Sequence, residues 1–215
     1  MKGATARRRA ARRPAPRERI LDAAVAEFAG RGFEAASTNA IAAAAGVAKG
    51  LVFHHFGSKD DLFVAAFDHV LARLIDALYA DLGPLPADLF ERLHAWAIHK
   101  IRVSQRDPLG YQLMTMAVQD GPPAVRARIE ERIAAVRTAH WPRFLDGIDA
   151  SRLRPGVSLP QAIETLSLLG EGIERAILPR LAALPDRGMS RLDDLGRELW
   201  EHFARLRDGL YPPNA

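Results

Sequence analysis

The spacing of apolar residues is the feature that most limits the folds open to this chain. From Arg17 onward apolar side chains recur every three or four residues, beginning with Ile20, Ala24 and Phe28. This is the period of an amphipathic helix, and no segment alternates apolar and polar residues convincingly, as a strand would. The pattern predicts an all-α fold of about nine helices.

Glycine, proline and capping residues divide this pattern into separate helices. The first helix should end at Gly32, because glycine adopts the left-handed conformation without steric cost. Ser37 or Thr38 can cap a second helix, Gly46 breaks it, and a short third helix follows. The expected helices span residues 17–30, 37–45, 48–55, 58–81, 87–105, 108–119, 122–147, 158–183 and 190–209.

The chain is expected to divide into three regions. We expect a disordered basic arm over residues 1–16, a small three-helix domain over 17–57, and a larger helical domain over 58–215. Ser58 has the character of an N-terminal helix cap and marks the start of the larger domain. Pro179 should kink or end the fourth helix after residue 87, because proline lacks the amide donor that a helix interior needs.

The basic arm and the residue after it form a dense block of positive charge. Seven cations precede the first acidic residue, Glu18, which leaves −3 for the other residues within a total of +4. These cations are Lys2, Arg7, Arg8, Arg9, Arg12, Arg13 and Arg17. Such a block can bind phosphates or a minor groove of DNA, and the affinity for DNA would then depend on salt. Alternatively, it is a solubilising tail without specific contacts.

Composition excludes several classes of protein. The chain has no cysteine, which excludes disulfides, thiolate zinc sites and thiol nucleophiles and fits a reducing cytoplasm. No apolar run approaches the roughly 20 residues of a membrane span, and no apolar block of a secretory signal follows the basic start. We therefore expect a cytoplasmic protein without a membrane partner, a cofactor or a metal site.

The segment from Ser37 to Leu62 predicts a helix-turn-helix, with its turn at Gly46. In such a unit the second helix enters the major groove of DNA with its N-terminal end first. Lys49 can reach guanine or a phosphate there, and Gly50 lets the helix lie close to the DNA. The residues expected to contact DNA are Ser37, Thr38, Ala48, Lys49, Gly50, Leu51, Phe53, His54, His55 and Lys59.

An ordered set of residues between about 18 and 65 extends this pattern. The set comprises Ile20, Ala24, Phe28, Gly32, Phe33, Thr38, Ile41, Ala42, Ala45, Gly46, Val47, Lys49, Gly50, His54, Phe56, Ser58, Lys59 and Leu62. In these residues the chain resembles the tetracycline-repressor (TetR) family of bacterial regulators. The resemblance implies a homodimer with an N-terminal helix-turn-helix DNA-binding domain and a C-terminal helical bundle for effector binding and dimerisation. It also implies a palindromic double-stranded DNA operator and release by a small-molecule effector.

Three positions depart from the family pattern. Ala48 stands where serine is common, Leu51 where threonine is common, and Phe53 where a tyrosine usually gives its phenol to a phosphate. Each change removes a hydroxyl donor from the surface expected to face DNA. Ala48 and Leu51 can instead touch thymine methyl groups, while His54 and His55 supply phosphate contacts. We therefore expect DNA binding to depend more on the basic arm than is usual.

The last two expected helices each carry an apolar seam. Residues on these seams include Leu166, Ile173, Ile177, Leu195, Leu199 and Phe203. Such seams can pair with a second copy of the chain as a four-helix bundle, which is also how the resembling family usually dimerises. Alternatively, the seams complete the core of a single chain.

The larger domain also holds candidates for an effector pocket. Pockets between helices are mostly apolar with a few converging polar groups, which favours Trp96, His99, Tyr111, Met114, Trp141, Glu171 and Glu174. Glu171, between two glycines of an apolar helix, can pair with an arginine, face solvent or receive a cationic ligand.

An enzyme is the main alternative class. The sequence has a single Glu-x-x-His motif, at Glu91 and His94, and not the two that a metal-binding helical bundle combines. It has no glycine-rich phosphate loop after a strand and no His-Glu-x-x-His motif, so no catalytic residues are predicted. A dimeric helical module that has lost DNA binding is another alternative, supported by the three missing hydroxyls. The operator sequence, the effector, the target genes, and repression as opposed to activation lie beyond the sequence.

Overall fold

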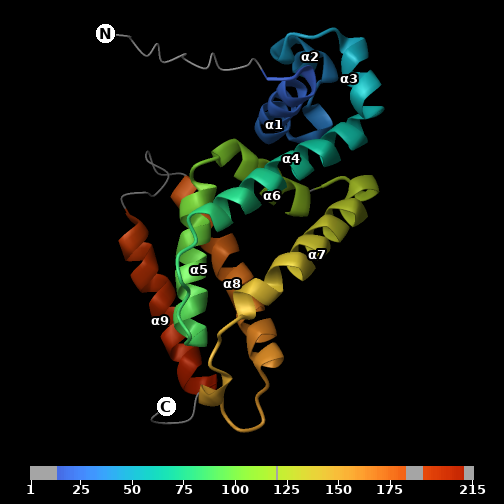
Figure 1. Cartoon of the computed structure of the whole chain (residues 1–215). Coiled ribbons are helices and arrows are strands. Elements are labelled where there is room, and N and C mark those ends of the chain that lie inside the picture. The colour runs from blue at the N-terminus through green and yellow to red at the C-terminus, as the bar shows by residue number, and fades with distance from the viewer. Residues whose placement is uncertain (1–13, 120, 183–190, 211–215) are drawn as a thin grey trace, which may run out of the picture. The chain divides into compact units, whose positions relative to one another are not determined.

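The computed structural model describes residues 14–119, 121–182 and 191–210. Within these ranges the backbone forms nine α-helices and one short 3-10 helix, and no strand occurs among them (Figure 1). The predicted all-α fold is therefore confirmed. The basic arm expected over residues 1–16 lies outside the described residues except for its last three positions.

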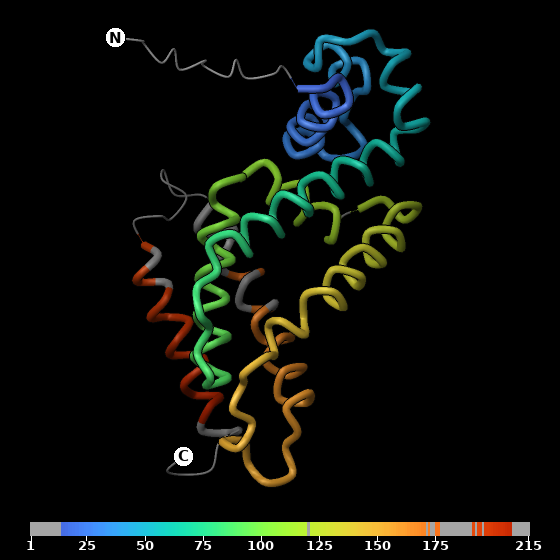
Figure 2. The backbone as a smooth tube through the Cα atoms, viewed as in Figure 1, coloured from blue at the N-terminus to red at the C-terminus, as the bar shows by residue number. Residues whose placement is uncertain are grey.

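The helix boundaries lie close to those that the sequence predicts. The helices are α1 (Pro16–Ala35), α2 (Thr38–Ala45), α3 (Lys49–Phe56), α4 (Lys59–Ala80), α5 (Leu89–Ser104), α6 (Pro108–Gln119), α7 (Pro123–Leu145), α8 (Leu159–Ala182) and α9 (Leu192–Leu210). The 3-10 helix, η1 (Ala150–Arg152), lies between α7 and α8 in the sequence. The chain can be followed from helix to helix in Figure 2.

A glycine and a proline test two of the predicted helix interruptions. Helix α1 consists of two helical segments joined by a kink at Gly32, where φ is 75° and ψ is 168°, so the regular helix is interrupted at the predicted glycine and a short second segment reaches Ala35. Helix α8 continues past Pro179 to Ala182, so the alternative that the helix ends near this proline is wrong. A proline near a helix end removes one backbone hydrogen bond, which the last turn tolerates.

The chain divides into two compact units. Unit 1 comprises residues 1–70 and 112–129, and unit 2 comprises residues 71–111 and 130–215. This division differs from the boundary expected between residues 57 and 58, because the first part of α4 packs into the core of the N-terminal helices. Leu62, Phe63 and Phe67 of α4 are fully buried there.

An aromatic cluster lies at the centre of unit 1. The Phe28 and Phe63 rings meet edge to face with centroids 5.0 Å apart, and Phe33 lies 5.2 Å from Phe63 in the same geometry. This arrangement is favourable for aromatic pairs beyond the area that they bury. It fixes α1 against α4 and so provides a rigid support for the two short helices between them.

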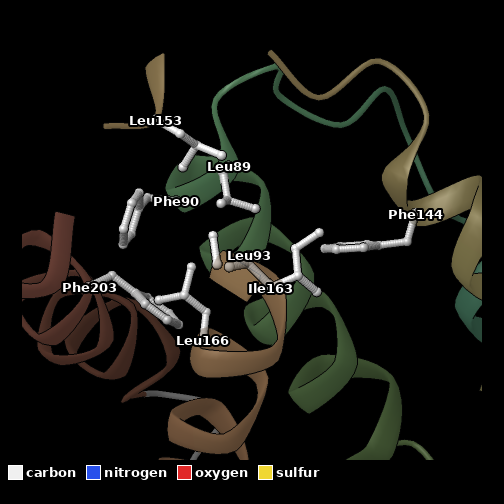
Figure 3. Packing of buried hydrophobic residues seen from close by; sticks show 9 residues of the cluster. Leu89, Phe90, Leu93, Phe144, Leu153, Ile163, Leu166 and Phe203 are labelled. Atoms are coloured by element: carbon white, nitrogen blue, oxygen red, sulfur yellow. The ribbon is translucent and has the colours of Figure 1, made fainter. Parts of the chain in front are cut away.

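The core of unit 2 is built from four helices. Leu89, Phe90 and Leu93 of α5 meet Phe144, Leu153, Ile163, Leu166 and Phe203 in one buried cluster (Figure 3). Helices α5 and α9 lie side by side, and His94 Nε2 donates to the carbonyl oxygen of Gly196 at 2.7 Å. A polar bond between two helices fixes their register, which apolar contacts alone do not do.

A buried arginine holds the loops at one end of this core. The Arg92 side chain is 3% exposed and donates to the carbonyl oxygens of Pro86, Phe144 and Asp146. Burial lowers the pKa of Arg92 from its ordinary value, although the group stays charged at neutral pH. Hydrogen bonds to three carbonyls offset the cost of burying this cation.

None of the helices in the described ranges is both long and apolar enough to cross a membrane.

Candidate nucleic-acid interface and effector cavity

Helices α2 and α3 form a tight helix-turn-helix in unit 1. Gly46 ends α2 in the left-handed conformation, with a φ of 63° and a ψ of 45°, and its amide donates to the carbonyls of Ala42 and Ala43. Val52 and Phe56 are the buried side chains of α3. Because these two residues lie one turn apart, they attach one face of α3 to unit 1 and leave the opposite face to solvent.

The solvent face of α3 carries most of the residues that the sequence selects for DNA contact. Lys49, Gly50, Phe53, His54 and His55 are exposed. The Lys49 ammonium lies 5.8 Å from the centroid of the Phe53 ring one turn further along, within range of a cation–π interaction. The helix tip therefore presents one cation beside an exposed aromatic ring.

No contact within the described residues requires a glycine at position 50. A methyl group added at its Cα would meet no heavy atom within 4 Å, and its φ is not positive. Glycine inside a helix costs roughly 0.5–1 kcal/mol relative to alanine, so a packing reason is normally expected. The open space at this position is suited to a surface that approaches the helix from outside.

The other expected contact residues differ in exposure. Ala48 is exposed and caps α3 without a side-chain hydrogen bond, whereas Leu51 is only half-buried. Ser37 caps α2, accepting from the amide of Ala40 at 3.4 Å, and its own amide donates to Glu27 at 3.0 Å. Its hydroxyl retains a proton to donate.

Lys59 is bound within unit 1. Its ammonium donates to the carbonyl oxygen of Glu34 at 3.1 Å and lies 4.8 Å from the centroid of the Phe33 ring. This geometry holds the end of α1 against the start of α4. DNA contact by Lys59 stays a prediction, and it would require this cation to leave or share these partners.

The attachment point of the basic arm is held beside the helix-turn-helix. Arg19 donates to the carbonyl of Ala45 at 2.9 Å and to the carbonyl of Pro14 at 3.2 Å. The Arg17 guanidinium lies 5.4 Å from the centroid of the Phe56 ring of α3. The chain therefore enters α1 next to the end of α2, which places Pro14, the first described residue, near the turn.

Unit 2 contains a cavity of about 690 Å³ between α5, α7, α8 and α9. Its lining is mostly apolar and includes Trp96, Trp141 and Phe144. Trp96 and Phe144 have ring centroids 5.6 Å apart, and Trp141 stacks on Phe144 at 5.2 Å. This volume and lining are typical of sites that bind small apolar molecules.

The cavity contains two of the seven residues that the sequence selects for effector binding. Trp96 and Trp141 line it, whereas His99, Tyr111 and Met114 do not. His99 Nε2 instead donates to the carbonyl of Leu78 at 2.9 Å. The side chains of Glu171 and Glu174 lie outside the described residues, so their placement is not compared.

Sequence reasoning missed the polar residues of the lining. These are Lys100, Arg137, Glu164 and Ser167. A signal was present for two of them, because Lys100 follows Trp96 by four residues and Arg137 precedes Trp141 by four. Residues four apart share a helix face, so a pocket that includes the tryptophans also reaches these cations.

The apolar seams of α8 and α9 contribute to the core of the chain itself. Leu166, Leu199 and Phe203 are buried inside unit 2, with exposed fractions of 1%, 4% and 3%. This placement favours the alternative that these three residues complete the core of one chain. The side chains of Ile173, Ile177 and Leu195 lie outside the described residues. Helix α8 also presents Leu168, which is 65% exposed, and Leu169, which is 38% exposed.

No cluster of three metal-ligating side chains occurs among the described residues. The fold and its sites define a helix-turn-helix protein with a second helical unit that encloses an apolar cavity. Residues 20–66 match the family model described as bacterial regulatory proteins, tetR family. This match covers the helix-turn-helix together with most of α1 and the start of α4, all of them in unit 1.

Several proteins similar to this chain are named as regulators. An HTH-type transcriptional repressor of Mycobacterium tuberculosis is 47% identical over 73 residues, which is 34% of this chain and 37% of the relative. The chain thus spans only about 37% of the length of such relatives. The HTH-type transcriptional repressor AcnR of Corynebacterium efficiens is 28% identical over 183 residues, covering 83% of this chain and 89% of AcnR.

A solved structure agrees with the fold over most of the chain. The crystal structure of a TetR-like transcriptional regulator from a Rhodococcus species matches with a TM-score of 0.63 and 25% identity. The match covers 90% of this chain and 97% of that structure. The relatives carry the names of regulators and repressors, which supports a class other than enzymes.

Proposed function

We propose that this protein is a DNA-binding transcriptional regulator that binds a palindromic operator as a homodimer and is released by a small-molecule effector. The exposed tip of α3 carries the first part of this proposal. Lys49 supplies a cation for guanine or phosphate, and Gly50 leaves room for the DNA surface. Because relatives are named repressors, repression is the expected direction of control.

Lys49 provides the direct test of DNA binding. Duplexes that the protein selects from a random-sequence library serve as the probe, and binding is measured by fluorescence anisotropy. Lys49→Ala should weaken binding at least tenfold, while Arg102→Ala, which removes an exposed cation from α5 in unit 2, serves as the matched control. Failure of the wild-type protein to select any sequence would reject the proposal, as would equal affinity of the two variants.

The homodimer is proposed from the requirements of a palindromic site and from the apolar side chains on α8. Two recognition helices must lie about 34–36 Å apart to enter successive major grooves. Exposed Leu168 and Leu169 give α8 a second apolar surface besides its buried one. Analytical ultracentrifugation of the wild-type chain and of Leu168→Glu tests this part. A monomeric wild type, or a variant that dimerises equally well, would contradict it.

Effector release is proposed from the cavity of unit 2. A ligand that binds one conformation better than another shifts the population between DNA-binding and released forms. The fluorescent apolar dye anilinonaphthalene sulfonate serves as a probe of the cavity, and Trp96→Ala should reduce its affinity severalfold. Dye binding that Trp96→Ala leaves unchanged would place the effector site elsewhere.

A further inference from the structure

Phe53 is a large apolar side chain that the core of unit 1 does not use. The residue is 40% exposed, whereas Val52 and Phe56 near it on α3 are 2% and 8% exposed. Exposing a phenylalanine ring to water is unfavourable, and this one lies at the side of the helix, next to the face that Val52 and Phe56 attach to the core. The ring is therefore available to a surface that contacts α3 from outside.

The side chains around Phe53 limit which chemical groups α3 can recognise on a surface that contacts it. Ala48 is exposed at the start of α3, and Leu51 is half-exposed, so neither supplies a hydrogen-bond donor or acceptor. Only Lys49 and the two histidines add polar groups to this face. Much of the outer face of α3 can therefore make apolar contacts only.

Thymine provides the apolar group that such a face can recognise. On the major-groove edges of the four bases, the thymine C5-methyl is the apolar group, and phenylalanine and alanine side chains contact it. We propose that Phe53 is a specificity-determining residue that reads thymine in the operator through this methyl group. The proposal rests on the proposed function, because it requires α3 to lie in the major groove.

The position of Phe53 on α3 predicts where this thymine lies. Lys49 and Phe53 are four residues apart, which corresponds to a rise of about 6 Å along the helix. Successive base pairs are about 3.4 Å apart, so the thymine lies within about two base pairs of the group that Lys49 contacts. The proximity of the Lys49 ammonium to the Phe53 ring, 5.8 Å, keeps the two contacts together.

Replacement of thymine by deoxyuridine tests the proposal, because it removes the methyl group and keeps the hydrogen-bonding edge. The probe is a duplex that the full-length protein selects from a random-sequence library, with each thymine replaced in turn. Burial of one methyl group is worth roughly 0.8 kcal/mol, so replacement at the contacted position should weaken binding about fourfold. Other positions should change less.

Variants of Phe53 test whether the loss of affinity caused by deoxyuridine depends on this residue. Phe53→Ala should remove the difference between thymine and deoxyuridine at the contacted position, and Phe53→Leu should retain part of it. Leu109→Ala, which shortens an exposed apolar residue of α6, should leave the difference unchanged. Circular dichroism melting checks that the variants fold, which the exposure of Phe53 leads us to expect.

The outcomes separate this inference from the proposed function. If the wild-type protein selects no sequence, DNA binding fails and the inference falls with it. If the protein selects a sequence but deoxyuridine has no effect at any position, the inference alone is overturned. The same holds if Phe53→Ala retains the discrimination that the wild-type protein shows.

Discussion

The rings of Trp96 and Tyr79 lie with their centroids 6.1 Å apart in unit 2. Trp96 lines the cavity, and Tyr79 belongs to the last part of α4, the helix whose first residues belong to unit 1. Tyr79 also stacks on His140 at 4.9 Å and lies 4.6 Å from the Arg143 guanidinium, while burial raises its pKa. A ligand that moves Trp96 would therefore act directly on the end of α4.

Tyr79→Ala should uncouple effector binding from DNA release. We expect the wild-type protein to lose operator affinity when anilinonaphthalene sulfonate binds, within the 5–150-fold range typical of allosteric coupling. Tyr79→Ala should bind the dye as the wild type does but show a smaller loss, and Tyr79→Phe should behave as the wild type. Anisotropy titrations of operator duplex with and without dye measure both quantities. Equal coupling in the two variants would contradict this role of Tyr79.

Gly50→Ala should affect stability and DNA affinity in opposite directions. The added methyl group meets nothing within the described protein, and alanine is favoured over glycine in a helix by roughly 0.5–1 kcal/mol. We expect the free energy of unfolding to rise by up to about that amount. Operator affinity should fall, because the methyl group occupies space needed by the DNA. Unfolding in urea and anisotropy measure the two effects, and a gain in both would reject close approach at Gly50.

Deletion of residues 2–13 should reduce the dependence of DNA binding on salt. The deletion removes Lys2, Arg7, Arg8, Arg9, Arg12 and Arg13 and leaves Pro14 bound to Arg19. Each phosphate contact that is lost lowers the slope of log K against log salt by roughly 0.9. Titrations at several salt concentrations measure this slope. Unchanged operator affinity in moderate salt would contradict a contribution from the arm.

Arg92→Met should destabilise unit 2. Methionine keeps much of the apolar stem but leaves the carbonyls of Pro86, Phe144 and Asp146 without their donor. Leaving buried polar groups unpaired costs about 1–3 kcal/mol for each group, and the effects are not additive. We expect a loss of about 3 kcal/mol in chemical denaturation, with Arg102→Met, at an exposed position of α5, as the control. Equal stability of the two variants would show that Arg92 does not hold these loops.

Asp61 should contribute to stability only above acidic pH. Its carboxylate accepts from the Ser58 hydroxyl at 2.6 Å and pairs with Arg128 at 3.0 Å, and these contacts lower its pKa from the ordinary value of 3.8. Because the folded-state pKa is the lower one, the contribution is complete above about pH 4 and is lost as the pH falls through the folded pKa. Asp61→Asn should therefore be less stable than the wild type at neutral pH. The difference should shrink as thermal melts are repeated toward pH 2, and a constant difference would contradict this assignment.

Local sequence signals were sufficient to predict the helices and the helix-turn-helix. The left-handed conformation at Gly46, the caps at Ser37 and Ser58, and the apolar spacing around Phe28 each depend on residues within a few positions of one another. Such interactions determine where helices begin and end whatever the surrounding structure. The all-α fold and the exposed tip of α3 could therefore be predicted before any tertiary structure was known.

Placement of side chains between distant helices was decided only by the tertiary structure. An apolar seam has the same spacing whether it meets another helix of the same chain or a second copy, so the sequence did not determine that Leu199 and Phe203 are buried within unit 2. Likewise, two tryptophans 45 positions apart meet one cavity only because α5 and α7 pack together. The sequence determines what each helix can bury, and packing determines which partner it is buried against.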